Sequence, residues 1–224
     1  MKIIDISQEV FHCAVYPGDP SPERIVMRKI GDESVCNLTA LKMCAHNGTH
    51  VDAPYHFIDR GKTIDQIDLS RFIGYAYVAS HEGNLSAADA EEILSRAQAA
   101  SVHTGIAECD CFSRILVKGN AVVTEEAAKA FADHGILLFG NESQTVGPED
   151  APMSVHLIML DSEIVLLEGI RLSAVEEGVY FLNAAPVNLG GSDGAPCRAW
   201  LMSVMNREHS CPPAILGPHP GETG

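Results

Sequence analysis

Short runs of apolar residues, some alternating with polar ones, follow one another along most of the chain. Runs rich in β-branched and aromatic residues predict strands, and they lie at residues 2–10, 23–30, 37–44, 71–80, 111–118 and 136–139. Two segments that begin with Ser or Thr and carry acidic residues in their first turns predict helices, at 86–97 and 124–134. Because strands and helices alternate between residues 71 and 139, the pattern favours the α/β class.

The size of the chain and its composition suit one domain. The chain has 224 residues, of which 46% are hydrophobic, and this is ample for a core. We therefore expect a single domain over residues 1–224. Its end, from about residue 211, is rich in proline and glycine, which predicts an extended or partly loose tail.

Charge and cysteine usage limit the partners and the compartment. A net charge of −15 repels nucleic acids and anionic membranes, so neither is an expected partner. No apolar run reaches the length of a membrane span, and the first residues lack a secretory apolar segment. The seven cysteines show no Cys-x-x-Cys framework, which favours reduced, mostly buried thiols. We expect a cytoplasmic protein.

A cluster of metal-type ligands follows the run at 37–44. Imidazole and carboxylate side chains together suit a borderline divalent ion such as zinc or manganese. Gly48 and Pro54 argue against a helix, so we expect the cluster on a strand end followed by an irregular segment. There His50 and Asp52, two residues apart, can point to one side. The cluster consists of His46, His50, Asp52 and His56.

A second pair of candidate ligands lies much later in the chain. Glu168 ends the apolar run at 164–167, where a carboxylate is costly unless it is paired or bound to a metal. A surface glutamate at a strand end is the alternative. His156 taken alone is a packing residue, and only its company makes it a candidate ligand.

The segment 46–56, His-Asn-Gly-Thr-His-Val-Asp-Ala-Pro-Tyr-His, closely resembles the His-x-Gly-Thr-His-x-Asp-x-Pro-x-His motif of the cyclase family of metal-dependent hydrolases. That family includes bacterial kynurenine formamidases and isatin hydrolases. Similar segments recur at 16–19, 56–65 and 178–198, so the resemblance covers nearly the whole chain. It implies an α/β fold, a single domain of mixed β-sheets with flanking helices of the swivelling β/β/α type. It also implies a homodimer or homotetramer.

The resemblance implies a site with two ions, Zn²⁺ (two per subunit) or Mn²⁺. By position, the first ion would be held by His46, His50 and Asp52 and the second by His156, with Asp52 and Glu168 shared. His56 would be the general base and then the acid for the leaving nitrogen. Tyr16 takes the place of an aromatic residue that reaches the substrate pocket, although it could equally be a loop residue that packs on the core.

The implied activity is hydrolysis of a C–N bond other than a peptide bond in a small molecule, with N-formylkynurenine as the first choice. Opening of a cyclic amide or lactone, as in isatin hydrolases, is the alternative, and a family member that binds metal without turnover is another. No Gly-x-Ser-x-Gly segment offers a serine nucleophile.

The sequence departs from the family pattern near residue 142. Glu142, Thr145 and Gly147 stand where the family has Asp, Ser and Asp, and the longer carboxylate of Glu142 would move the substrate if it faces the pocket. Lys118 stands where an arginine is frequent, and the two are not equivalent if a planar fork is needed. Arg198 is expected to form a structural ion pair.

Overall fold

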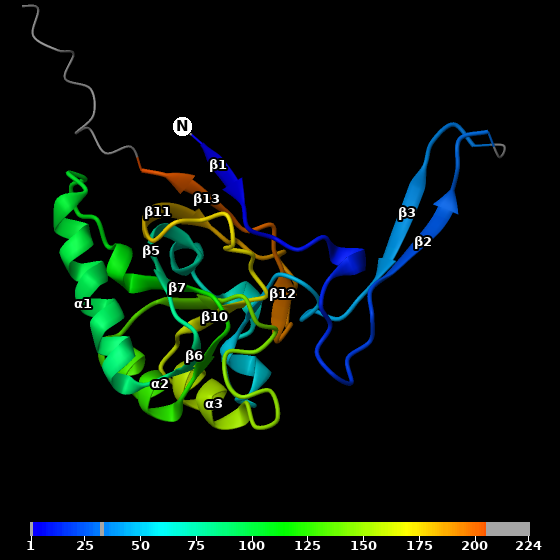
Figure 1. Cartoon of the computed structure of the whole chain (residues 1–224). Coiled ribbons are helices and arrows are strands. Elements are labelled where there is room, and N and C mark those ends of the chain that lie inside the picture. The colour runs from blue at the N-terminus through cyan, green and yellow to red at the C-terminus, as the bar shows by residue number, and fades with distance from the viewer. Residues whose placement is uncertain (1, 32–33, 205–224) are drawn as a thin grey trace, which may run out of the picture.

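A large mixed sheet with three helices on one side forms the body of the molecule (Figure 1). The structure is a computed structural model that describes residues 2–31 and 34–204. The sheet order is β1-β13-β11-β5-β7-β9-β10-β4-β12. Its strands are β1 Ile3–Asp5, β4 His50–Asp52, β5 Ile73–Ser80, β7 Arg114–Lys118, β9 Leu138–Asn141, β10 Val165–Glu168, β11 Gly178–Asn183, β12 Gly194–Pro196 and β13 Trp200–Ser203.

The four central strands β5, β7, β9 and β10 run parallel, and the outer pairs are antiparallel. The parallel strands read as continuous apolar runs because both of their faces are covered. A small parallel pair lies beside them, β6 Gly83–Leu85 with β8 Ala121–Val123. This arrangement confirms the predicted α/β class with mixed sheets and flanking helices.

The two predicted helices are present, and each begins where its cap predicts. Helix α1 spans Ala87–His103, and the hydroxyl of Ser86 accepts a hydrogen bond from the backbone N–H of Asp89. Helix α2 spans Glu125–Asp133 and is capped in the same way by Thr124. A third helix, α3 Met153–Asp161, was not predicted. It is apolar on most sides, so it has no amphipathic pattern to find.

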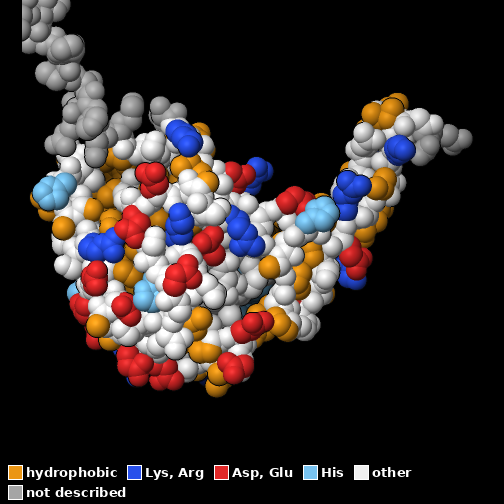
Figure 2. Space-filling model, viewed as in Figure 1, with side chains coloured by type: hydrophobic (Ala, Val, Ile, Leu, Met, Phe, Trp, Pro, Cys, Tyr) orange, Lys and Arg blue, Asp and Glu red, His pale blue; other side chains and the backbone are white. Residues whose placement is uncertain are grey.

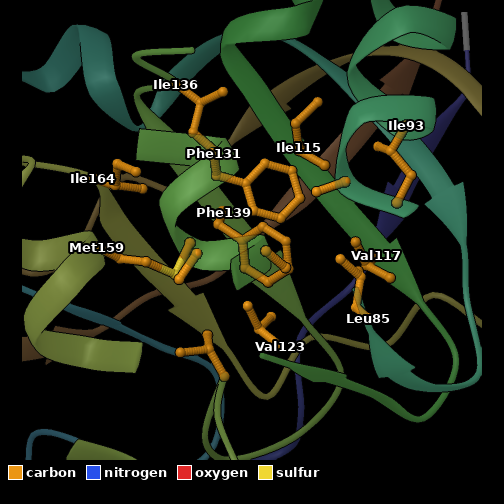
Figure 3. Packing of buried hydrophobic residues seen from close by; sticks show 14 of the residues in the cluster. Leu85, Ile93, Ile115, Val117, Val123, Phe131, Ile136, Phe139, Met159 and Ile164 are labelled. Carbon is orange, nitrogen blue, oxygen red and sulfur yellow. The ribbon is translucent and has the colours of Figure 1, made fainter. Parts of the chain in front are cut away.

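The core lies on both faces of the sheet. On the helical side, Phe131 of α2 packs against Phe139 of β9, with ring centroids 5.1 Å apart (Figure 3). Around them gather buried aliphatic side chains from the strands and from all three helices. A second apolar cluster fills the opposite face. The central strands are therefore rigid supports for whatever their ends carry.

A hairpin projects from this body (Figure 1). It is formed by β2 Glu23–Arg28 and β3 Leu38–Lys42, which pair antiparallel with a register shift near Val26. Apolar and basic side chains share its surface (Figure 2). Its exposed large apolar residues on the two strands are Ile25, Val26, Met27, Leu38 and Leu41.

Several boundaries differ from the expectation. The first strand ends at Asp5 rather than at residue 10, and the strand expected at 111–118 begins at Arg114 after a 3-10 turn. Within residues 2–31 and 34–204, no helix has the length and apolarity of a membrane span. The six cysteines of this part are free, but only Cys109 and Cys111 are buried, so the expectation of mostly buried thiols was wrong. The tail from about residue 211 lies outside the described residues.

Candidate metal centre

The centre of the site is the short strand β4, which carries two candidate ligands on one face. Strand β4 lies between β10 and β12 and pairs antiparallel with both. Because side chains alternate along a strand, His50 and Asp52 point to the same side. Glu168 of β10 is the partner of His50 in the register, and the Nε2 atom of His50 lies 3.4 Å from Glu168 Oε2 and 3.4 Å from Asp52 Oδ1.

The orientation of the His50 ring is fixed by the chain before the strand. Its Nδ1 lies 3.0 Å from the carbonyl oxygen of Gly48, so Nε2 faces the carboxylates. Gly48 adopts a φ of +70°, a conformation that glycine tolerates best. A side chain there would also lie 3.2 Å from Cys13 Cβ.

His156 approaches from helix α3. Its Nδ1 lies 2.8 Å from the carbonyl oxygen of Pro152, and its Nε2 lies 3.3 Å from Glu168 Oε1 and 3.7 Å from Asp52 Oδ2. The helix that sequence patterns missed therefore supplies one of the expected ligands. Glu168 Oε1 also accepts a hydrogen bond from the backbone N–H of Val146, at 2.9 Å.

The donor set fits divalent ions. Asp52 is fully buried, and its Oδ2 has no hydrogen-bond partner among the described residues, which is costly for a carboxylate oxygen that no cation meets. Two groups have ligand atoms within 4.8 Å of one another, and Asp52 belongs to both. Mixed imidazole and carboxylate ligands suit zinc or manganese. The groups are His46, Asp52, His56 and His50, Asp52, Glu168.

The assignment of these ligands to two ions stays a prediction. His46 and His50, which were expected on the same ion, both lie close to one oxygen, Asp52 Oδ1. Strand pairing sets His50 opposite Glu168, and His46, which precedes the strand, reaches the same Asp52 oxygen as His50 does. His46 Nδ1 lies 2.8 Å from Asp52 Oδ1.

In the chain without ions, the carboxylates hold protons on the imidazoles. Burial alone would lower the pKa of His46, but hydrogen bonds to Asp193 and Asp52 raise it to about 11. Burial alone would also lower the pKa of His50, but hydrogen bonds to Asp52 and Glu168 outweigh this effect and raise the pKa to about 10. The pKa of His156 is also raised, by Glu168 against the effect of burial. These rings are thus built to carry positive charge, their own or that of an ion.

His56 behaves differently from the other three imidazoles. It ends the 3-10 turn Pro54–His56, and its ring stacks on that of His46 with centroids 4.1 Å apart. Burial lowers the pKa of His56, so the ring is uncharged near pH 7. Its Nδ1 lies 3.2 Å from Asp193 Oδ2. A neutral imidazole beside the ligands can accept a proton.

A cavity of about 360 Å³ opens onto these groups. Tyr16 lines it too, but its hydroxyl donates to the carbonyl oxygen of Glu149 at 2.8 Å rather than to a ligand. Asp52 lies beneath the surface of the cavity. The other residues that line it are Asp19, Cys44, His46, His50, His56, Phe57, Gln144, Thr145, Pro152, His156, Glu168 and Asp193.

Glu142 does not line this cavity, so its longer carboxylate is not expected to move a substrate bound there. Its two carboxylate oxygens accept hydrogen bonds from the backbone N–H groups of Gly119 and Leu172, each at 2.8 Å. The longer side chain therefore ties two loops together. Thr145, in contrast, is buried and lines the cavity. Gly147 packs closely on α3, since a Cβ there would lie 3.2 Å from Val155 Cβ.

The remaining candidates have structural partners. Lys118 Nζ donates to the carbonyl oxygens of Ser173 and Val175, and Arg198 forms an ion pair with Asp5 at 2.6 Å, as expected. Apart from His46, His50, His56 and His156, none of the histidines in the described residues lines this cavity. His209 and His219 lie outside that part of the chain.

One residue of the site was missed by sequence reasoning. Asp193 lies in a glycine-rich turn between β11 and β12, and its Oδ2 contacts both His46 and His56. In the sequence, Asp193 lies in the segment Gly-Gly-Ser-Asp-Gly-Ala-Pro at 190–196, and such a segment more commonly indicates a turn.

Comparison with known proteins agrees with this picture. Residues 4–148 match the model of the Cyclase family. Kynurenine formamidase from Salinibacter ruber is 35% identical over 215 residues, which cover 90% of this chain and 97% of that protein. The structure described as a potential metal-dependent hydrolase with cyclase activity has a TM-score of 0.70 and 26% identity, and covers 89% of this chain and 96% of its own. Isatin hydrolase A from Labrenzia aggregata has a TM-score of 0.73 at 18% identity, with 91% and 94% covered, which shows a shared fold.

Proposed function

The chain belongs to the Cyclase family, and from that premise we propose that it is a metal-dependent hydrolase that cleaves the C–N bond of an aryl formamide, N-formylkynurenine first. The observation that carries the proposal is the kynurenine formamidase relative, which matches over nearly the full length of both chains. The expected ligands all lie in or directly beneath one cavity, which supports it.

We assign the ions to residues that the structure brings together. His46, His50 and Asp52 would hold the first ion and His156 the second, with Asp52 and Glu168 shared. The contacts of His46 and His50 with Asp52 Oδ1, and of His156 with Glu168 and Asp52 Oδ2, support this assignment. Ions bound there supply a Lewis acid that polarises the formyl carbonyl and lowers the pKa of a water. Zinc is our first choice because imidazole dominates the donor set, and manganese is compatible with its oxygens.

His56 moves the proton. Its Nδ1 is engaged with Asp193, so Nε2 is the atom that can accept a proton from the attacking water. The water oxygen bonds to the formyl carbon, the C–N bond breaks, and His56 returns the proton to the leaving aryl nitrogen. The products are formate and the free arylamine. We assign Tyr16, at the wall of the cavity, to contact with the aryl part of the substrate.

The test is N-formylkynurenine hydrolysis by protein of known metal content, before and after removal of metal with a chelator and after reconstitution. Turnover that disappears with the metal and returns with zinc or manganese supports the proposal. Bound metal with no formamidase turnover, but with turnover of isatin, would replace it with the lactam alternative. Bound metal with turnover of neither would leave a binding protein.

We also propose a homodimer or homotetramer, and the projecting hairpin supports it. A two-stranded hairpin is marginally stable in water, yet β2 and β3 expose five large apolar side chains. The two strands carry three basic residues and one acidic residue, while the chain as a whole has a net charge of −15. A second acidic copy of this chain is therefore electrostatically suited to cover the hairpin. The cytoplasmic location stays a prediction.

A further inference from the structure

We propose that Asp193 is a positioning residue that sets the orientation and the proton position of two imidazoles at once, those of His46 and His56. A single carboxylate oxygen would thereby link an ion ligand to the general base. The inference deepens the proposed function and rests on it, because that function gives His56 its role as general base. The geometry of the two rings is the same whatever the substrate is.

The first support is the convergence of two ring nitrogens on one oxygen. Asp193 Oδ2 lies 2.8 Å from His46 Nε2 and 3.2 Å from His56 Nδ1. The two rings stack with an interplanar angle of 27° and centroids 4.1 Å apart. Neighbouring imidazoles that both direct an N–H toward the same point need an acceptor there, and a carboxylate is the strongest available.

The second support is the way in which the carboxylate is held. The carbonyl oxygen of Asp193 accepts a hydrogen bond from the backbone N–H of Ala53 at 2.9 Å, directly after β4. On the other side, the Ser192 hydroxyl donates to the carbonyl oxygen of Gly194 at 2.8 Å. Asp193 is thus tied to the strand that carries the ligands, as expected of a preorganised supporting residue.

Gly194 lets this arrangement close. A Cβ at Gly194 would lie 2.8 Å from His46 Cε1 and 2.7 Å from the carbonyl oxygen of Val51, so any other residue would displace the ring or the strand. The glycine next to Asp193 therefore has a packing reason. It brings the edge strand β12 against the His46 ring while the carboxylate engages that ring's Nε2.

The consequence is a defined tautomer for each ring when that ring is neutral. Which imidazole nitrogen carries the proton is set by the hydrogen bond that the other one makes. With Nε2–H of His46 donated to Asp193, Nδ1 is left facing Asp52, at 2.8 Å, as the ligand atom. With Nδ1–H of His56 donated to the same oxygen, Nε2 is left with its lone pair. Carboxylates that orient metal-binding histidines in this way are recurring outer partners of metal sites.

The experiment compares Asp193→Asn and Asp193→Glu with Asp65→Asn as a matched control. Asp65 belongs to the same loop system, where its Oδ1 accepts from the Gly191 backbone N–H at 2.9 Å, but it does not contact the rings. Three readouts apply: the tautomer of His56 by long-range ¹H–¹⁵N correlation in metal-free protein, zinc affinity by competition with a chelating dye, and kcat and KM separately.

For Asp193→Asn we expect a mixed tautomer for His56, zinc affinity lower by about 10–100-fold, and kcat lower by about 10–100-fold with KM changed less than about threefold. Asp193→Glu should recover part of each, and Asp65→Asn should change none. An unchanged His56 tautomer with unchanged zinc affinity in Asp193→Asn, or equal effects in Asp65→Asn, would overturn the inference. If wild-type protein lacks formamidase activity, the proposed function fails, while the His56 tautomer and the zinc affinity still decide on Asp193.

Discussion

Glu168 lies directly opposite His50 in the antiparallel pair of β10 and β4, and its Oε2 is 3.4 Å from His50 Nε2. Two groups from opposite halves of the chain therefore meet because of strand register alone. Both are almost fully buried, so water solvates neither charge and the contact between them is hardly screened. This contact makes Glu168 the residue through which the second half of the sequence enters the site.

We expect Glu168→Gln to bind zinc at least about 10–100-fold more weakly, because loss of even an outer partner of a ligand costs that much. A neutral amide keeps the shape but not the charge. Metal content by mass spectrometry after dialysis checks this. The control is Glu163→Gln, since Glu163 pairs at the surface with Lys62 and Arg71. Full metal retention in Glu168→Gln would remove Glu168 from the ligand set.

His56→Ala should separate chemistry from metal binding. Removal of a general base typically lowers kcat by about 10²–10⁴-fold, while the zinc content should stay close to that of wild type. Steady-state hydrolysis of N-formylkynurenine and metal analysis on the same sample measure both. His134→Ala, at an exposed histidine paired with Glu91, is the control. If the variant loses its metal instead, His56 is a ligand, as its place in one of the two groups allows.

Glu142 should matter for stability and not for substrate. Its removal leaves the backbone N–H groups of Gly119 and Leu172 without their acceptor, which costs about 1–3 kcal/mol of unfolding free energy. Urea denaturation of metal-free Glu142→Ala checks this value. The KM of the metal-loaded variant should stay within about twofold of the wild-type KM. Glu149→Ala, at an exposed carboxylate that follows in the same segment of the sequence, serves as control. A large rise in KM with unchanged stability would return Glu142 to the pocket.

The sequence could predict what local chemistry determines. The capping residues Ser86 and Thr124 place the starts of α1 and α2, and the dense spacing of ligand types at 46–56 identifies a metal cluster without any fold. His50 and Asp52 on one strand face follow from the period of two.

What the sequence could not predict depends on pairing between distant segments. Asp193 gains its role only when β12 lies against β4, and nothing local distinguishes it from a turn aspartate. The direction of Glu142, away from the cavity, depends on where Gly119 and Leu172 come to lie. Helix α3 escaped because an element apolar on most sides shows no period.

Zinc binding should release protons and strengthen as pH rises. In the metal-free chain the pKa of His46 is raised to about 11 and that of His50 to about 10, so both rings are protonated at neutral pH. A ring must lose a proton to become a ligand, so each unit of pH below these values weakens binding. Calorimetry in buffers of different ionisation enthalpy measures the released protons. Binding that is independent of pH between about 6 and 9 would contradict the ligand assignment of both rings.

Val26→Glu tests the hairpin as an assembly surface. Val26 is 58% exposed on β2, and a charge placed there would be buried unpaired if a second copy covers the hairpin. We expect wild-type protein to be a dimer or tetramer in sedimentation velocity, and the variant to dissociate at least about tenfold more readily, a change of about 1.4 kcal/mol. Val102→Glu is the matched control, because Val102 is 74% exposed on α1, far from the hairpin strands in sequence.

High salt should also weaken assembly, since the hairpin is basic and the rest of the chain acidic. A monomeric wild type, or a Val26→Glu variant that assembles as well as the Val102→Glu control, would show that the hairpin serves another purpose.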